Sequence, residues 1–169
     1  MLLTDNQGNT VDWFEIYFNS TKQTNHYMHL SGGSDSALTL FIMAKCLYDK
    51  KKTSDTLNCL YVQNTSKGYE DPGINVPLLI KYVERKFPLI KIKLWKIKAE
   101  KTNNPKGPIL KKVQDIAGGA GCIVINSIQQ GPDFITGFRS KEELYKLGLF
   151  ARRPYVNVDK RFFAHQYKK

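Results

Sequence analysis

The chain of 169 residues is organised around one segment, which reads His26-Tyr27-Met28-His29-Leu30-Ser31-Gly32-Gly33-Ser34-Asp35-Ser36. A short run that leans apolar leads into a glycine-serine turn, and an apolar run over residues 37–44 follows the turn. This order predicts a strand, a tight turn and then a helix. Adjacent glycines let the backbone turn tightly and approach a ligand closely, and the N–H groups of a helix's first turn attract an anion. The segment therefore indicates a phosphate-binding loop.

Two common phosphate-binding motifs are excluded by the residues of this loop. A P-loop needs a lysine at its end, and residues 31–36 contain none. The dinucleotide fingerprint Gly-x-Gly-x-x-Gly is also absent. The serine hydroxyls add hydrogen-bond donors, and Asp35 offers a carboxylate to a metal ion that accompanies phosphate. The plainer alternative, a serine-glycine loop without a ligand, stays open at this point.

Residues 31–36 resemble the Ser-Gly-Gly-x-Asp-Ser signature of the PP-loop ATP pyrophosphatases, the adenine nucleotide alpha hydrolase-like superfamily. The resemblance implies ATP and Mg²⁺ as cofactors and cleavage of ATP between its alpha and beta phosphates. A substrate oxygen would attack the alpha phosphorus, pyrophosphate would leave, and a nitrogen or sulfur nucleophile would then displace AMP. Asp35 would bind the metal and act in catalysis, and the ends of the first two strands, Leu30 and Val62, would flank the adenine. The remaining nucleotide-binding residues that the resemblance implies in the loop are Ser31, Gly32, Gly33, Ser34 and Ser36.

A second segment, residues 152–161, resembles the late part of PP-loop enzymes, where a proline-containing loop returns to the site and a lysine opens the last helix. The resemblance implies that Lys160 acts in catalysis by neutralising the beta or gamma phosphate. Arg153, or its neighbour Arg152, would bind phosphate or substrate through a two-pronged guanidinium. The alternative is that Asp159 caps the last helix and that Lys160 is only exposed.

The order of elements predicts an α/β fold with a doubly wound, mainly parallel sheet and helices on both faces. We expect strands at residues 26–30, 57–63, 89–97 and 122–125. Helices are expected at 35–50, from the Asp71-Pro72 pair to about Lys86, at 109–117, at 141–147 and from about Asp159. Residues 1–25 read as a lead-in, and residues 126–169 as a substrate-side loop followed by the C-terminal helix. The whole chain is expected to form one ATP-binding domain.

Two of these strands have patterns that place them in the sheet. Apolar residues alternate with lysines over residues 90–95, which suits an edge strand because charges there oppose edge-to-edge pairing. Residues 122–125 are apolar throughout, as in a central strand that is covered on both faces. Ligands of such sheets bind at the carboxyl ends of the strands, where residues 31–36 and 126–132 would both fall.

Composition limits the class of protein further. No apolar run is long enough to span a membrane, and the first residues turn polar too early for a secretory signal. Three widely spaced cysteines, Cys46, Cys59 and Cys122, form no C-x-x-C pair, so we expect buried free thiols in a reducing cytoplasm. The three histidines are not spaced as a metal site.

The chain carries a net charge of +11, and the excess of cations is concentrated. Eleven lysines and arginines lie between Lys81 and Lys112, opposed by Glu84 and Glu100. Such a stretch could attract a nucleic acid, which leaves tRNA open as a partner. The alternative is a solvated face of a lysine-rich protein, and aromatic residues are not regularly interleaved there to form a stacking platform.

Within the superfamily, the loop and the late segment are nearest to those of the 7-cyano-7-deazaguanine synthases of queuosine biosynthesis. The four zinc-binding cysteines of those enzymes are absent here. The resemblance implies an adenylylating ligase that acts on an unidentified small molecule or nucleobase. A tRNA-modifying or amide-forming PP-loop enzyme, or a nucleotide- or RNA-binding module that has lost turnover, are the alternatives. The oligomeric state stays open.

Overall fold

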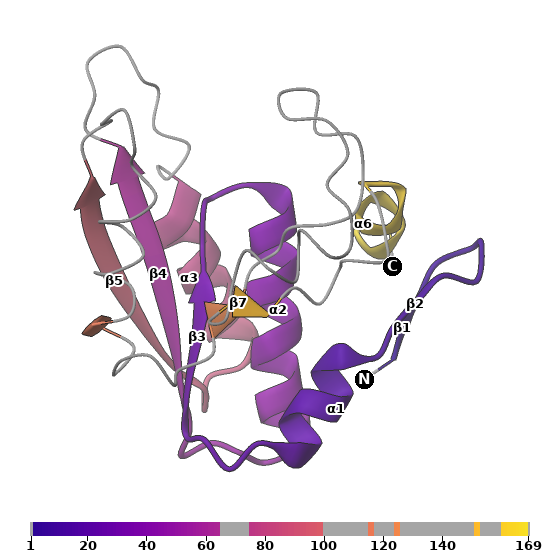
Figure 1. The fold of residues 1–169 in the computed structure, drawn as a ribbon, viewed down its shortest axis with the longest axis horizontal. Coiled ribbons are helices and arrows are strands. Elements are labelled where there is room, and N and C mark those ends of the chain that lie inside the picture. Colours follow the sequence, from indigo (N-terminus) through magenta and orange to yellow (C-terminus); the bar gives the residue numbers. More distant parts are fainter. Residues whose placement is uncertain are drawn as a thin grey trace.

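A computed structural model describes residues 2–64, 75–99, 115–116, 124–125, 151–152 and 160–168. Within these residues, the main sheet is parallel and has five strands in the order β5-β4-β3-β6-β7 (Figure 1). The strands are β3 (Asn25–His29), β4 (Thr56–Asn64), β5 (Lys91–Ala99), β6 (Val124–Ile125) and β7 (Ala151–Arg152). The chain runs outward from β3 to one side and then returns to the other, which confirms the doubly wound α/β fold.

The described helices are α1 (Trp13–Ser20), α2 (Ser34–Asp49), α3 (Val76–Lys86) and α6 (Lys160–Gln166). Helix α2 is central, because α1, α3 and α6 all pack against it (Figure 1). Near the N-terminus, β1 (Leu3–Thr4) and β2 (Thr10–Val11) pair as a short antiparallel hairpin. None of the helices in the described part of the chain is long and apolar enough to cross a membrane.

Burial along the strands follows their positions in the sheet. Residues 57–61 of β4 are all buried, as expected for a strand with β3 on one side and β5 on the other. On β5, Ile92 and Leu94 pack toward the helices while Lys91 and Lys93 are exposed. The prediction of an edge strand is confirmed, since β5 pairs only with β4 among the described strands.

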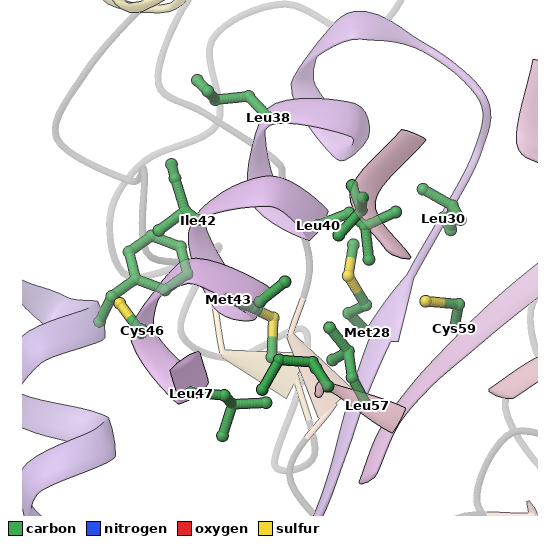
Figure 2. Close-up of a cluster of buried hydrophobic side chains, with 14 of the residues drawn as sticks. Met28, Leu30, Leu38, Leu40, Ile42, Met43, Cys46, Leu47, Leu57 and Cys59 are labelled. Atoms are coloured by element: carbon green, nitrogen blue, oxygen red, sulfur yellow. The ribbon is translucent and has the colours of Figure 1, made fainter. Parts of the chain in front are cut away.

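The main core lies between the sheet and helices α1, α2, α3 and α6. Figure 2 shows Leu40 and Met43 of α2 facing Met28 of β3 and Leu57 of β4, and all four side chains are fully buried. Leu38, Ile42, Cys46 and Leu47 extend the same cluster along α2. Burial of a large apolar side chain stabilises a fold by about 1.5–3 kcal/mol, so α2 and the strand before it are held firmly together. The loop between them is therefore anchored at both ends by buried side chains.

A smaller apolar cluster lies on the opposite face of the sheet. Leu60 and Ile97 are its buried members, and Tyr27, Val62, Trp95 and Ile116 pack against them. Ile116 is helical and lies in the connection from β5 to β6. A right-handed crossover to the other side of β3 would pass over this face, which agrees with helices on both faces.

Several predicted boundaries are wrong. Helix α3 has Asn75 as its N-cap and Pro77 in its first turn, so it begins later than the predicted Asp71-Pro72 start, and that pair lies outside the described residues. Strand β5 begins at Lys91, two residues after the predicted start, because Phe87–Ile90 form a turn after the helix. The lead-in contains an unpredicted hairpin, and the expected long loop contains strand β7. The predicted helix at 141–147 lies outside the described residues.

Candidate functional site

The predicted phosphate loop lies at the point where the strand order reverses. Residues 31–33 connect the carboxyl end of β3 to α2, and β3 has β4 on one side and β6 on the other. The N–H of Leu30 donates to the carbonyl oxygen of Leu60 at 3.0 Å, so pairing with β4 continues up to the loop. Doubly wound sheets bind ligands at such a reversal of strand order.

The backbone of the loop needs its first glycine. Gly32 has a φ of +85°, a conformation that residues with a Cβ adopt only at a cost. Gly33 is extended and is the N-cap of α2, and no side chain caps the helix there. An uncapped helix N-terminus presents backbone N–H groups and a positive dipole end toward the space above it. This arrangement suits an anion such as phosphate.

A ring of hydrogen bonds holds the loop in shape. The Ser36 hydroxyl, which is only 4% exposed, donates to the Gly33 carbonyl oxygen at 2.9 Å and accepts from the Ser31 N–H at 3.2 Å. The Ser31 hydroxyl lies 3.1 Å from the Ser36 Oγ and accepts from the Gly33 N–H at 3.4 Å. Since its one proton is used within the loop, the Ser36 hydroxyl shapes the loop. Ser31, which is exposed, is better placed to meet a ligand.

Asp35 lies in the first turn of α2, and its carboxylate accepts a hydrogen bond from the Ser34 hydroxyl at 3.1 Å. Its own carbonyl oxygen accepts from the Thr39 hydroxyl at 2.8 Å. No group of three or more His, Cys, Asp or Glu side chains suited to a metal occurs among the described residues. Mg²⁺ commonly takes one or two carboxylates and completes its shell with phosphate oxygens and water. A single carboxylate at the helix start fits a magnesium ion that arrives with a nucleotide.

The C-terminal helix reaches the same place. The Tyr167 hydroxyl donates to the Ser34 carbonyl oxygen in the first turn of α2. Burial and, to a lesser degree, the negative charge of Asp35 raise the pKa of Tyr167. The neighbouring Gln166 amide donates to the Thr4 carbonyl oxygen of β1 at 3.0 Å. Tyr167 was not predicted as a site residue, because a lone tyrosine matches no motif.

The other predicted site residues are placed less completely. Leu30 is buried on the α2 side of the sheet, whereas Val62 packs on the opposite face. Lys160 is the first residue of α6, so the helix expected after Asp159 is confirmed, but its side chain is not described. Arg152 lies in β7 and is placed by its backbone alone, and Arg153 lies outside the described residues. The roles predicted for Lys160 and Arg153 therefore stay predictions.

Several buried titratable groups lie in the core rather than in the loop. His26 is fully buried, with the Tyr17 hydroxyl 3.0 Å from its Nδ1 and an Asp55 carboxylate oxygen 3.0 Å from its Nε2. Burial lowers the pKa of His26, although Asp55 opposes this shift. Cys46 and Cys59 are buried free thiols, as predicted, whereas Cys122 lies outside the described residues. Burial raises the pKa of Cys46 to about 11. Such a thiol is a poor nucleophile at neutral pH.

The chain as a whole has structural relatives among known proteins. It is similar in fold to the NH3-dependent NAD synthetase from Campylobacter jejuni subsp. jejuni NCTC 11168, whose structure is a complex with the nitrate ion. The TM-score is 0.58 at 15% sequence identity, and the match covers 94% of this chain and 69% of the synthetase. The likeness confirms the doubly wound fold independently of the loop motif.

A second solved structure is related more weakly. It is a protein of the universal stress protein family from Burkholderia pseudomallei, with a TM-score of 0.39, 11% identity, and coverage of 79% of this chain and 98% of that protein. This likeness is too weak to carry an argument. No family model matches the chain, and no curated protein is similar enough in sequence to match.

Proposed function

We propose that the protein is an ATP-dependent enzyme that adenylylates an oxygen of its substrate and releases pyrophosphate. The observation that carries this proposal is the loop of residues 31–36 at the strand reversal, with Gly32 in a left-handed conformation and the start of α2 uncapped. The signature of the loop resembles that of PP-loop enzymes, and the fold is that of an NH3-dependent NAD synthetase.

In this proposal, some residues of the loop maintain its shape and others bind the nucleotide. The ring formed by Ser36 holds the loop open, while the first turn of α2 and Ser31 face the anion and stabilise charge that develops on leaving pyrophosphate. Asp35 would hold Mg²⁺, which neutralises phosphate oxygens when bound. Because the Leu30 N–H is already bonded to Leu60, its backbone would meet the adenine through its carbonyl oxygen. Lys160 and Arg153 complete the proposed set as cations for the outer phosphates and the substrate.

The second half of the proposed reaction replaces the activated oxygen. A nitrogen or sulfur nucleophile attacks the adenylylated carbon, the carbon–oxygen bond breaks, and AMP leaves with that oxygen. The ammonia used by the structurally similar synthetase supports nitrogen as the nucleophile. A carboxylate on a nucleobase, as in a 7-cyano-7-deazaguanine synthase-like ligase, is the proposed acceptor class.

The test separates the possible products of ATP. Purified protein is incubated with Mg²⁺, ATP labelled at the alpha or gamma phosphate, ammonium or sulfide, and a panel of carboxylic acids that includes nucleobase carboxylates. AMP and pyrophosphate are the expected products, whereas ADP as the sole product contradicts the proposal. Tight binding of a non-cleavable ATP analogue without turnover across the panel would instead favour a nucleotide-binding module.

Asp35→Ala tests the metal-binding residue in the same assay. We expect pyrophosphate release to fall by roughly a hundredfold, since loss of metal assistance costs several kcal/mol of transition-state stabilisation. Asp49→Ala is the matched control, because Asp49 is an exposed carboxylate at the other end of the same helix. Equal rates for the two variants would remove Asp35 from the site.

A further inference from the structure

Positive charge is distributed very unevenly between residues 2–64 and residues 75–99, which both contribute strands to the main sheet. Residues 2–64 contain five lysines and six carboxylates, a net charge of −1. Residues 75–99 contain seven cations and one carboxylate, Glu84, a net charge of +6. More than half of the net charge of +11 therefore comes from α3 and β5. A lysine-rich composition alone would spread the cations more evenly.

All seven of these cations are exposed, and we call them together the basic edge: Lys81, Arg85, Lys86, Lys91, Lys93, Lys96 and Lys98. Successive residues of a strand point to opposite faces of a sheet. Lys91 and Lys93 therefore share a face with Trp95, and the Lys93 Nζ lies 3.9 Å from the centre of that ring. Lys96 and Lys98 lie on the other face, the one that α3 covers.

The β5 lysines of the basic edge form a line along the strand. From Lys91 to Lys98 the strand rises about 3.3 Å per residue, or roughly 23 Å in all. Among the described strands β5 pairs with β4 alone, so its outer side has no strand partner there (Figure 1). The line ends at the carboxyl edge of the sheet, which is also the edge that carries residues 31–33.

This arrangement selects among polyanionic partners. A planar anionic membrane would contact only one of the two lysine rows at a time, because the rows project from opposite faces of the sheet. A flexible chain of phosphates that runs along the strand can meet both rows. Lysine contacts to phosphate are long-range, tolerant of geometry and independent of base sequence. Trp95 does not offer a free ring for base stacking, because Lys93 lies over the ring and the indole N–H donates to Asn58 at 3.0 Å.

We infer that the basic edge binds the phosphodiester backbone of single-stranded nucleic acid. Binding is electrostatic and lacks base readout, since the described part of the edge offers cations rather than a free stacking surface. The inference does not depend on the ATP chemistry proposed above, because no residue of the loop takes part.

The experiment measures fluorescence anisotropy of a labelled single-stranded RNA and of the DNA of the same sequence, with the full chain, over about 50 to 300 mM salt. Each phosphate contact contributes about −0.7 to the slope of log affinity against log salt, or roughly fivefold in affinity at 0.1 M salt. The double variants K91Q/K93Q and K96Q/K98Q should each weaken binding by roughly 25-fold and reduce the slope by about 1.4. RNA and DNA should be affected alike.

The control is K22Q/K51Q, which removes the same charge from two exposed lysines outside the basic edge and should leave affinity nearly unchanged. All substituted lysines are exposed, so circular dichroism should show intact folds. Failure of the wild-type protein to bind at low salt would overturn the inference, as would equal losses in the control. Tighter binding to duplex, or loss from one row alone together with binding to phosphatidylserine vesicles, would also overturn it.

Discussion

The β3–loop–α2 region and the α3–β5 region lie side by side around one sheet, but they differ in what their polar and charged groups contact. In the first, polar groups bond to one another: Ser31, Gly33 and Ser36 form a closed ring, and the surrounding segment is close to neutral. In the second, cations point outward along an edge strand and on the helix beside it. The first region presents a loop backbone that its own hydrogen bonds hold in one shape, which suits one ligand in one pose. The second presents exposed cations on long side chains, which suit a long polyanion in many poses.

A change in the backbone of the first region should lower both stability and activity, and we expect it to have the strongest combined effect of the four changes below. Gly32→Ala places a Cβ at a φ of +85°, which costs about 1–2 kcal/mol and distorts the loop. Gly8 has a φ of +83° with open space around it, so Gly8→Ala carries the same strain far from the loop. Both variants should lose similar stability in urea unfolding. Only Gly32→Ala should also lower pyrophosphate release, by more than tenfold, while nucleic-acid binding stays unchanged.

Ser36→Ala should cost a comparable amount of stability and have a smaller effect on the nucleotide. It removes a buried hydroxyl that serves both the Ser31 N–H and the Gly33 carbonyl, and unsatisfied groups of this kind cost about 1–3 kcal/mol. Affinity for a non-cleavable ATP analogue, measured by calorimetry, should fall severalfold as the loop loosens. The exposed Ser54 provides the control, Ser54→Ala. Unchanged stability and affinity in Ser36→Ala would show that the ring does not shape the loop.

Acidification should lower the free energy of unfolding, because two histidines of β3, the strand that leads into the loop, are buried or half-buried. Burial lowers the folded-state pKa of His26 and of His29, so both bind protons more readily in the unfolded chain. Stability is therefore full above the unfolded pKa of about 6.5 and declines as the pH falls below it, by up to about 1.4 kcal/mol per pH unit for each histidine. Urea unfolding at about pH 7.5 and 5.5 measures this. Greater stability at the lower pH would contradict the assignment.

The smallest expected effect concerns the contact between the C-terminus and the loop. Tyr167→Phe removes the hydroxyl that donates to Ser34 but keeps the ring, so folding should be preserved. We expect the KM for ATP to rise about threefold with little change in kcat, as for loss of one hydrogen bond of about 0.5–1.5 kcal/mol. Tyr82→Phe, on the exposed side of α3, is the matched control. Identical KM values would limit Tyr167 to helix packing.

Much of this fold could be predicted because local patterns coincide with the tertiary arrangement. Three elements can be recognised from their own residues: the apolar run of α2, the alternating lysines of β5, and the glycine-serine loop between β3 and α2. The two-residue strands β1, β2 and β7 carry none, since a strand so short shows no periodicity. The predicted start of α3 is wrong because two nearby segments, Asp71-Pro72 and Asn75-Val76-Pro77, both match the pattern of a helix start. The structure has Asn75 as the N-cap.

For the site, the anion-binding character of residues 31–36 could be predicted from the sequence, because glycine conformation and helix-terminal N–H groups act locally. The different roles of these residues become visible only once the chain is folded. Ser36 faces inward and holds Gly33 because α2 packs against the core, and Tyr167 reaches Ser34 across the fold because α6 packs against α2. Likewise, the lysines are visible in the sequence, but the pairing of β5 with β4 alone among the described strands turns them into one continuous edge. Local geometry follows from neighbouring residues, whereas such contacts arise only when distant segments are packed together.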